Sequence, residues 1–161
     1  METMNNITLR DVVETDLPIF FEFQLDPEAN RMAAFTAKDP ADREAFMAHW
    51  RRILAAASVI VQTIERDGQV AGSVLSYEDE GRPEVSYWIG RPFWGQGIAT
   101  AGLRLFLANA NQTRPIYARA ARDNVGSLRV LQKCGFRVIE EMTGYANARG
   151  QEIAELLLVL E

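Results

Sequence analysis

Two glycines separated by a single residue mark the stretch of sequence best suited to chemistry. Gly95 and Gly97 flank Gln96, and residues 98–108 that follow are rich in Ala and Leu, as is typical of a helix. Glycines at such a junction let a backbone come close to a ligand, and the first helical turn offers unpaired N–H groups with partial positive charge. The stretch therefore predicts a phosphate or pyrophosphate site, with an ordinary tight turn as the alternative.

The glycine turn completes neither of two familiar phosphate-binding motifs. It lacks the Gly-Lys-Ser/Thr ending of a Walker loop and the third spaced glycine of a dinucleotide fingerprint. Residues 84–89 before it contain Val, Tyr, Trp and Ile, which predicts a strand. Pro92 cannot donate to a ladder and should end that strand. The expected order is strand, glycine turn and helix.

A second polar group lies on a predicted helix over 124–133. Asn124 is a favoured cap residue, and Lys133 in the last turn would interact favourably with the helix dipole. Gly135 follows where a helix needs a left-handed residue to stop. Capping alone would explain these residue types.

Taken together, the two groups resemble the acetyl-CoA motif of the GNAT N-acetyltransferase superfamily, and most closely its RimJ/RimL-like branch. The first block is Glu-Val-Ser-Tyr-Trp-Ile-Gly followed by Phe-Trp-Gly-Gln-Gly-Ile-Ala-Thr, and the second is Asn-x-x-Ser followed by Lys-x-Gly-Phe. The superfamily pattern places Gln or Arg three residues before the first glycine, where this chain has Pro92. Arg91 lies one residue too early, so no role is transferred to its side chain.

The resemblance implies acetyl-CoA as co-substrate, without a metal. Backbone N–H groups of the glycine turn and the first helical turn would bind the pyrophosphate, and the end of the preceding strand would pair with the pantetheine arm. Asn124 would contact pantetheine, Ser127 would lie near the thioester sulfur, and Lys133 would lie near a CoA phosphate. The implied cofactor-binding residues are Trp88, Ile89, Gly90, Gly95, Gln96, Gly97, Ile98, Ala99, Thr100, Asn124, Ser127 and Lys133.

Three residues become candidates for catalysis. Many GNAT enzymes have a Tyr general acid where this chain has Leu131, which leaves Ser127 or water to assist the departing thiolate. Glu84 is a candidate general base toward the attacking amine, with a solvated strand end as the alternative. Tyr145 resembles the loop Tyr that follows a catalytic Glu in some RimL-like enzymes. Its predecessor here is Gly144, so the base stays unassigned.

The lone histidine and the lone cysteine both have ordinary interpretations. His49 falls in a predicted helix and is expected to be a surface or packing residue. Cys134 is expected to be a small core residue, because no His lies near it in the sequence, and no covalent intermediate is expected. No His, Cys and carboxylate cluster has metal-site spacing.

Length and composition predict one soluble globular domain over residues 1–161, with 48% hydrophobic and 24% charged residues. No apolar run approaches the roughly 20 residues that span a bilayer, and residues 1–6 lack the features of a signal peptide. With one cysteine no intrachain disulfide can form, which favours a reducing compartment, the cytoplasm. A net charge of −5 argues against nucleic-acid binding.

Periodicity and turn residues predict a mixed α/β (α+β) fold. The resemblance makes it a GNAT-like, mostly antiparallel twisted sheet of about seven strands, with helices on both faces and a splay between the central strands. Asp16 should cap the first helix, Asp39 should cap the second with Pro40 in its first turn, and Asp67-Gly68 should form a hairpin turn. A loop should hold Gly144, Tyr145 and Gly150. The expected strands are 7–13, 58–64, 69–77, 84–89, 115–120, 136–142 and 153–160, and the later helices are 98–109 and 124–133.

The sequence thus predicts an acetyl-CoA-dependent N-acetyltransferase that acetylates a primary amine by direct attack in a ternary complex. The amine would be a protein N-terminal α-amine or a small-molecule amine. Two alternatives remain, a catalytically inactive CoA-binding module and a nucleotide-phosphate binding protein. No nucleic-acid or membrane partner is expected, and the choice between monomer and homodimer stays open.

Overall fold

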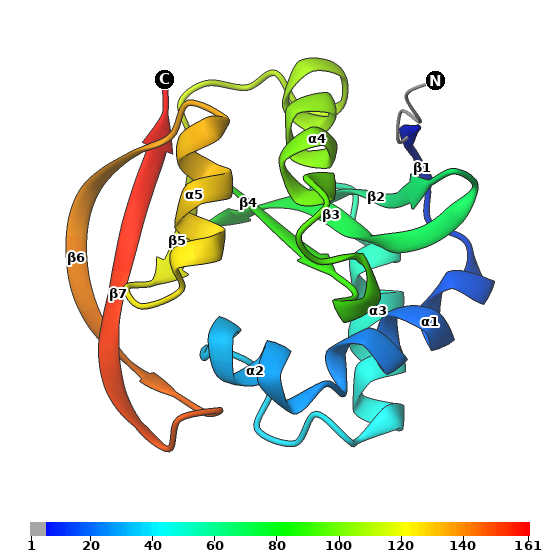
Figure 1. Cartoon of the computed structure of the whole chain (residues 1–161), viewed down its shortest axis with the longest axis horizontal. Helices are drawn as coiled ribbons and strands as arrows, with labels where there is room; N and C mark the ends of the chain where they lie inside the picture. Colours follow the sequence, from blue (N-terminus) through cyan, green and yellow to red (C-terminus); the bar gives the residue numbers. More distant parts are fainter. Residues whose placement is uncertain (1–5) are drawn as a thin grey trace.

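The computed structural model describes residues 6–161, and Figure 1 shows a curved sheet with helices on both of its faces. The absence of signal-peptide features was expected from residues 1–6, and residues 1–5 of that segment lie outside the described part. The strands are β1 (Ile7–Asp11), β2 (Ile60–Arg66), β3 (Gln69–Asp79), β4 (Arg82–Ile89), β5 (Ile116–Ala121), β6 (Arg137–Ala146) and β7 (Gln151–Leu160). The helices are α1 (Leu17–Gln24), α2 (Pro27–Ala33), α3 (Arg43–Ala55), α4 (Ile98–Leu105) and α5 (Val125–Lys133).

The sheet has seven strands in the order β1-β2-β3-β4-β5-β7-β6. Every neighbouring pair is antiparallel except β4 and β5, which are parallel. The predicted mixed fold, with a mostly antiparallel sheet of about seven strands, is confirmed. Within residues 6–161 no helix has both the length and the apolar character needed to cross a membrane.

Side chains alternate across the sheet and build two separate cores. On one face, α4 and α5 pack on the central strands through a large cluster that includes Leu103, Phe106, Leu131 and Leu158. On the other face, α1 and α3 contribute Leu17, Phe20 and Trp50 to a smaller aromatic cluster. The two cores hold α4 and α5 on the face opposite α1 and α3 (Figure 1).

Two tight turns fix the register of the central hairpins. Asp67 and Gly68 have φ values of 51° and 81°, and Glu80 and Gly81 have 51° and 80°. Positive φ at both central residues is the signature of a type I′ turn, whose twist matches that of the flanking strands. The hairpin predicted at Asp67-Gly68 is confirmed.

The predicted cap of α3 is wrong by three residues. Asp42, not Asp39, accepts the helix N–H, from Ala45 at 3.0 Å, and α3 begins at Arg43. Asp39 instead bonds the N–H of Ala41 at 3.1 Å within a preceding turn. An Asp-Pro-x-Asp run offers two cap candidates, and the structure uses the second as the helix cap and the first as a turn acceptor.

The prediction for Asp16 is confirmed in position only, because Asp16 is the N-cap residue of α1 but its side chain makes no cap hydrogen bond. It is 2% exposed, and its carboxylate accepts hydrogen bonds from Arg10 at 2.7 and 2.9 Å. The hydroxyl of Thr63 donates at 2.7 Å and the N–H of Val13 at 3.0 Å. Asp16 thus ties α1 to β1 and β2.

Other boundaries moved for local reasons. Gly144 and Tyr145 belong to β6, not to a loop, and the β6/β7 connection is only residues 147–150. The helix predicted over 98–109 is confirmed, although its last part, Phe106–Ala110, has wider π-type turns. The short helix α2 (Pro27–Ala33) begins after Asp26, whose carboxylate accepts N–H bonds from Glu28 and Ala29 at 2.8 and 3.2 Å.

We predict that Asp16→Asn lowers the free energy of unfolding by about 2–3 kcal/mol, because it leaves Arg10 without its buried partner and Thr63 and Val13 with a poorer one. Burial alone raises the pKa of Asp16, but the bonds from Arg10, Val13 and Thr63 outweigh it, so the folded-state pKa lies below the ordinary carboxyl value. The ionised carboxylate therefore stabilises fully above about pH 4 and loses that effect as pH falls toward its lowered pKa.

Urea unfolding at about pH 7 and about pH 3 measures this effect. The difference between wild type and variant should shrink at the lower pH. Glu14→Gln is the control, because Glu14 and its partner Arg51 are 63% and 62% exposed, and its effect should stay within about 0.5 kcal/mol. Equal stability of Asp16→Asn and wild type at neutral pH would contradict the assignment.

Candidate functional site

The glycine turn is open toward solvent and leads directly into α4. Gly95 and Gly97 have φ values of 73° and 74°, and a Cβ at either would meet no atom within 4 Å. Gly97 caps the helix without a side-chain bond, and the N–H of Ala101 donates to its carbonyl at 3.0 Å. The N–H groups of the first turn of α4 therefore lack partners within the helix. They belong to Ile98, Ala99 and Thr100, which the sequence assigned to pyrophosphate.

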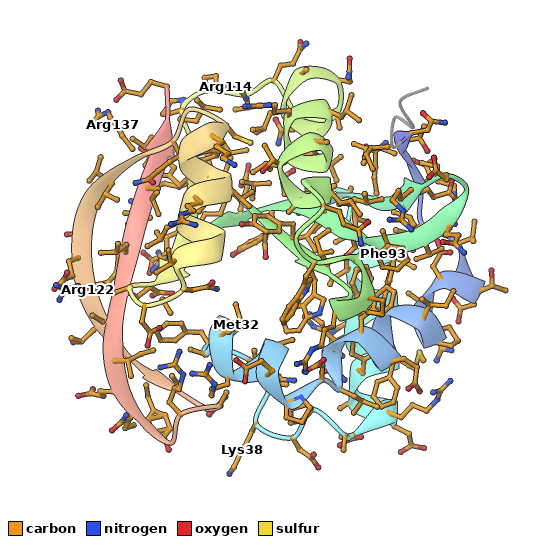
Figure 2. All side chains as sticks on the ribbon, in the orientation of Figure 1. Met32, Lys38, Phe93, Arg114, Arg122 and Arg137 are labelled. Carbon is orange, nitrogen blue, oxygen red and sulfur yellow. The ribbon has the colours of Figure 1, made fainter. Side chains whose placement is uncertain are left out.

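Arg66, at the end of β2, reaches this same turn. One of its guanidinium nitrogens contacts the Gln96 side-chain oxygen, and the group stacks 5.1 Å over the ring of Phe93, which is labelled in Figure 2. Gln96 in turn donates to the carbonyl of Pro92 at 3.2 Å. No carboxylate in the described part of the chain forms an ion pair with Arg66. The turn thus has a cation beside it.

Sequence reasoning missed Arg66, because Arg66 and Gln96 are 30 residues apart. The only hint was the departure at Pro92, where the expected polar side chain is absent. The guanidinium of Arg66 lies near Pro92, the position where the family pattern has Gln or Arg.

The central strands β4 and β5 separate immediately after one paired position. Only Glu84 and Tyr117 pair across β4 and β5, so the rest of β4 has a free backbone edge on that side. The N–H of Gly90 is already bonded to the Ala71 carbonyl at 2.9 Å, toward β3. Backbone groups alternate sides along a strand, so Trp88 also faces β3, whereas Tyr87 and Ile89 face the opening.

This alternation corrects the predicted pantetheine contacts. Of Trp88, Ile89 and Gly90, only Ile89 directs its backbone toward the opening. Its carbonyl already accepts the indole N–H of Trp94 at 2.8 Å, which leaves its N–H for a ligand. Tyr87, not named from the sequence, offers the second open backbone position.

The start of α5 lies across the opening from β4. Asn124 accepts the N–H of Ser127 at 3.2 Å, which confirms the predicted cap. The hydroxyls of Tyr87 and Ser127 are 2.7 Å apart, and the Tyr87 hydroxyl is also 3.3 Å from the Ser127 carbonyl oxygen. The sequence missed this pair, since the two residues lie 40 positions apart and Tyr87 read only as a strand residue.

Tyr87 keeps its proton over the physiological range. Burial raises the pKa of Tyr87 to about 12, an effect that the bond to Ser127 only partly offsets. The neutral hydroxyl can therefore donate to Ser127 while the Ser127 hydroxyl points elsewhere. Leu131, at the position of the family's acid, is 1% exposed and packs in the main core.

The C-terminal end of α5 lies close to α4. The thiol of Cys134 is 3.7 Å from the carbonyl oxygen of Thr100, and the carbonyl of Lys133 accepts from Arg104 at 2.9 Å. Lys133 is exposed near the pyrophosphate candidates. Burial raises the pKa of the Cys134 thiol, so the group is mostly protonated and a poor nucleophile. His49 is exposed on α3, as expected of a surface residue.

Glu84 is not a solvated strand end, and that alternative is wrong. The residue is 1% exposed, and Nε of Arg119 donates to its carboxylate at 3.1 Å. The hydroxyl of Tyr77 donates to the same oxygen at 3.4 Å. Arg119 also approaches Asp79 at 3.3 Å, so a buried polar network surrounds Glu84. Its lone pairs are engaged and solvent is excluded.

Tyr145 is not brought to the other candidates. It is 60% exposed on the edge strand β6. A Cβ on the preceding residue, Gly144, would lie 3.2 Å from the ring of Phe35, so that position faces the rest of the protein. Alternation along the strand then directs Tyr145 away. In the described residues no group of three or more His, Cys, Asp or Glu side chains is arranged to hold a metal ion.

Comparisons with known proteins identify a family for this chain and support its fold. A model of the acetyltransferase (GNAT) domain family matches residues 6–137. The uncharacterized N-acetyltransferase p20 of Bacillus licheniformis is 24% identical, over 95% of this chain and 92% of that protein. Mycobacterium smegmatis RimJ in complex with CoA-disulfide has a TM-score of 0.79 at 23% identity, over 96% of this chain and 81% of that chain. Spermidine N-acetyltransferase from Vibrio cholerae, solved with CoA and spermine, has a TM-score of 0.77 at 16% identity, over 95% of each chain.

If the glycine turn binds the pyrophosphate of CoA, as the resemblance implies, Arg66→Gln should weaken acetyl-CoA binding about tenfold. A charge-assisted bond to phosphate contributes about 1.5–3 kcal/mol, and the partial exposure of Arg66 places it at the lower end. Isothermal titration with acetyl-CoA measures the dissociation constant. Arg137→Gln is the matched control, since Arg137 is 62% exposed and pairs only with Glu161. An unchanged affinity in folded Arg66→Gln would remove Arg66 from the site.

Proposed function

Because the chain belongs to the acetyltransferase (GNAT) domain family, we propose that it transfers the acetyl group of acetyl-CoA to a primary amine by direct attack in a ternary complex. The observation that carries this proposal is the free backbone edge of β4. It runs from the parting at Glu84 to the glycine turn, with Ser127 on the facing helix. An extended arm that ends in a pyrophosphate fits such an edge.

Binding of the cofactor would rely mainly on backbone groups. The pyrophosphate would sit on the N–H groups of the first turn of α4, with Arg66 supplying the charge that Pro92 does not. The pantetheine arm would pair with Tyr87 and Ile89 in the manner of an added strand. Asn124 and Lys133 would lie along its course, as the resemblance implies.

The Ile89 N–H would polarise the thioester carbonyl. A fixed backbone donor stabilises the oxyanion that forms when the amine attacks, and it needs no reorganisation during the reaction. Alignment of the amine against the carbonyl carbon would contribute several kcal/mol more. A carbon–nitrogen bond forms, the carbon–sulfur bond breaks, and the electron pair leaves on the CoA sulfur.

Ser127 would stabilise the departing thiolate by donating a hydrogen bond. A thiol has a pKa near 8.5, so the thiolate is a good leaving group and needs no strong acid. Solvent can supply its proton. Tyr87 would donate to Ser127 and so direct the Ser127 proton toward the sulfur, which makes Tyr87 a positioning residue.

The amine would lose its proton to water. The buried network around Glu84 argues against direct proton transfer to that residue, and we assign Glu84 instead to holding Arg119 at the point where β4 and β5 pair. The exposed position of Tyr145 supports no catalytic role for it. The sequence left the general base unassigned, and this proposal gives that role to water.

We predict that the purified protein acetylates primary amines and that Gly97→Glu abolishes acetyl-CoA binding. The glutamate would place a negative side chain where the pyrophosphate approaches, and Gly97 also requires φ of 74°, which a side chain disfavours. Release of free CoA across an amine panel measures the activity. Titration of folded Gly97→Glu with acetyl-CoA measures binding.

Two outcomes would contradict this proposal. Undiminished affinity in Gly97→Glu would move the cofactor elsewhere. Acetyl-CoA binding without CoA release from any amine would favour the inactive CoA-binding module, to which Leu131 lends some support. Competition by ATP against acetyl-CoA would favour a nucleotide-phosphate binding protein.

We further predict that Ser127→Ala lowers kcat about tenfold, more than it weakens acetyl-CoA binding. General acid assistance is typically worth about 10²–10⁴-fold, and a good leaving group reduces the need for it. Tyr87→Phe should lower kcat by a smaller factor. The double variant should resemble Ser127→Ala, since Tyr87 acts only through Ser127. Single-turnover kinetics at saturating acceptor would test this.

Melting curves must first establish that all three variants fold, because Ser127 lies in the first turn of α5 and its replacement could destabilise the helix. Asn124→Ala is the control for the helix end, with an expected loss of about 1 kcal/mol in stability from the missing cap. Additive effects of the Tyr87 and Ser127 changes, or an unchanged kcat in Ser127→Ala, would overturn the pairing and leave water alone as the donor.

A further inference from the structure

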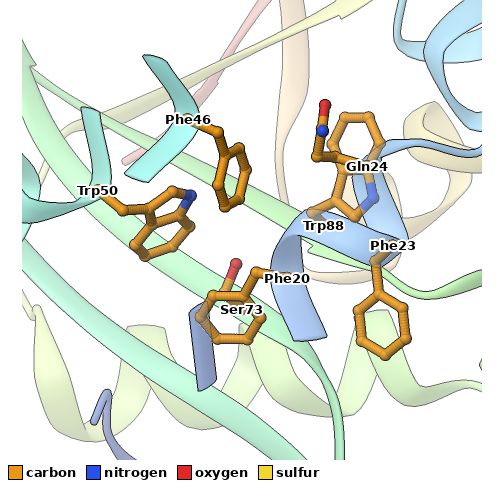
Figure 3. A pocket seen from close by; sticks show the side chains of 7 residues that line it. All are labelled: Phe20, Phe23, Gln24, Phe46, Trp50, Ser73 and Trp88. Atoms are coloured by element: carbon orange, nitrogen blue, oxygen red, sulfur yellow. The ribbon is translucent and has the colours of Figure 1, made fainter. Parts of the chain in front are cut away.

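A pocket on the α1/α3 face of the sheet is lined almost entirely by aromatic rings. Its volume is about 90 Å³, and it opens to the surface on one side. In Figure 3 the rings of Phe46 and Trp50 stand on one side and the indole of Trp88 on the other. The lining residues are Phe20, Phe23, Gln24, Phe46, Trp50, Ser73 and Trp88.

This pocket adjoins the backbone proposed to hold the thioester. Trp88 precedes Ile89, whose N–H we assign to the thioester carbonyl, and Ser73 lies directly opposite Trp88 in the β3/β4 register. The ring of Phe23 packs closely on Gly90, the residue after Ile89, and a Cβ on Gly90 would fall 2.5 Å from that ring. A group in the pocket would therefore lie beside the reacting carbonyl.

The lining carries no ionisable side chain. Its polar groups are the amide of Gln24, the hydroxyl of Ser73 and the indole N–H of Trp88, and that N–H is buried without a hydrogen-bond partner. The Gln24 amide is itself bonded to the Pro40 carbonyl at 2.6 Å. A second ammonium on the substrate would lose its hydration here without gaining an anionic partner, and a carboxylate would gain only neutral donors and no cation.

We propose that this pocket binds an uncharged apolar group on the acceptor, so that the acceptor is a primary amine carrying one phenyl-sized substituent. The inference rests on the proposed function and names its substrate class. A closed apolar cavity of roughly 150 Å³ holds a benzene molecule, and this smaller pocket with an open side suits a single ring or a branched aliphatic group. The surrounding rings favour edge-to-face packing with such a group.

Two kinds of acceptor share this chemistry. One is a small arylalkylamine, and the other is a peptide whose first residue has an apolar side chain. In both, a short spacer separates the amine from the apolar group. Polyamines and amines bearing a carboxylate lack this chemistry and should be poor acceptors.

Competing acceptors provide the first test. We expect kcat/KM for phenethylamine to exceed that for ethylamine by about tenfold or more, because a buried phenyl group is worth more than one such factor. Spermidine and β-alanine should fall below ethylamine. A peptide amide that begins with Phe, compared with one that begins with Gly, tells whether the natural source is a small amine or a polypeptide.

Two pocket variants test the location. Ser73→Val fills the floor of the pocket, and Phe46→Ala removes a half-buried wall. Each should bring the phenethylamine-to-ethylamine ratio of kcat/KM close to one. Leu54→Ala is the matched control, since Leu54 lies on α3, is 37% exposed and does not line the pocket. Its ratio should equal that of wild type.

A binding measurement separates this inference from the proposed function. Trp50 and Trp88 both line the pocket, so phenethylamine should change the tryptophan fluorescence of wild type and not of folded Ser73→Val. Acetylation of ethylamine without preference for phenethylamine would overturn the pocket and leave the function standing. Fluorescence binding without acetylation of any amine would support the pocket and overturn the function. A preference retained in both folded variants would place the apolar group elsewhere.

Discussion

The structure depends on one interruption in an otherwise continuous sheet. Among the strands of residues 6–161, β4 and β5 are the only parallel neighbours, and they pair at a single position, Glu84 with Tyr117. Buried backbone N–H and C=O groups need partners, so an unpaired strand edge in the middle of a sheet is costly unless something occupies it. A ligand with an extended backbone-like arm satisfies that need. The buried contact between Glu84 and Arg119 fixes where the parting begins.

The main core determines what faces this opening. Leu103 and Phe106 of α4 and Leu131 of α5 are buried against the same strands, so the two helices are held on one face. Gly102 allows α4 to come close to β2, since a Cβ there would lie 2.9 Å from the side chain of Ile64. The glycine turn, at the start of α4, and Ser127, in the first turn of α5, are placed by this packing. The positive ends of two helix dipoles thus lie on the same face of the sheet, where the proposed cofactor would bind.

The opposite face has a different chemistry. Arg10, Asp16 and Thr63 anchor α1 to the first two strands through a buried polar network. Anchored in this way, α1 presents Phe20 and Phe23 toward Trp88 and leaves an apolar pocket beside the strand end. The side of β4 where we propose the cofactor is therefore rich in backbone donors, and the side where we propose the acceptor is rich in rings. A thioester at Ile89 would lie between the two.

Local signals in the sequence were sufficient for several features. The glycine turn, the Asn124 cap and the Asp67-Gly68 hairpin depend on contacts within a few residues, and all three are present. The strand and helix order followed from periodicity, and the fold followed from the resemblance of two short blocks. Asp39 and Asp42 show the limit of local reasoning, because both residue types are competent caps and only the structure shows that Asp42 is the one used.

The sequence alone thus determined where the glycine turn and the Asn124 cap lie and what type of fold carries them. Only the tertiary structure decided which side chains distant in the sequence meet. Tyr87 and Ser127 are 40 residues apart, Arg66 and Gln96 are 30 apart, and Thr63 and Asp16 are 47 apart. Such contacts depend on strand register and on the side of the sheet that each residue faces. Both are set by the packing of the whole chain, since a shift of one residue reverses every side chain of a strand.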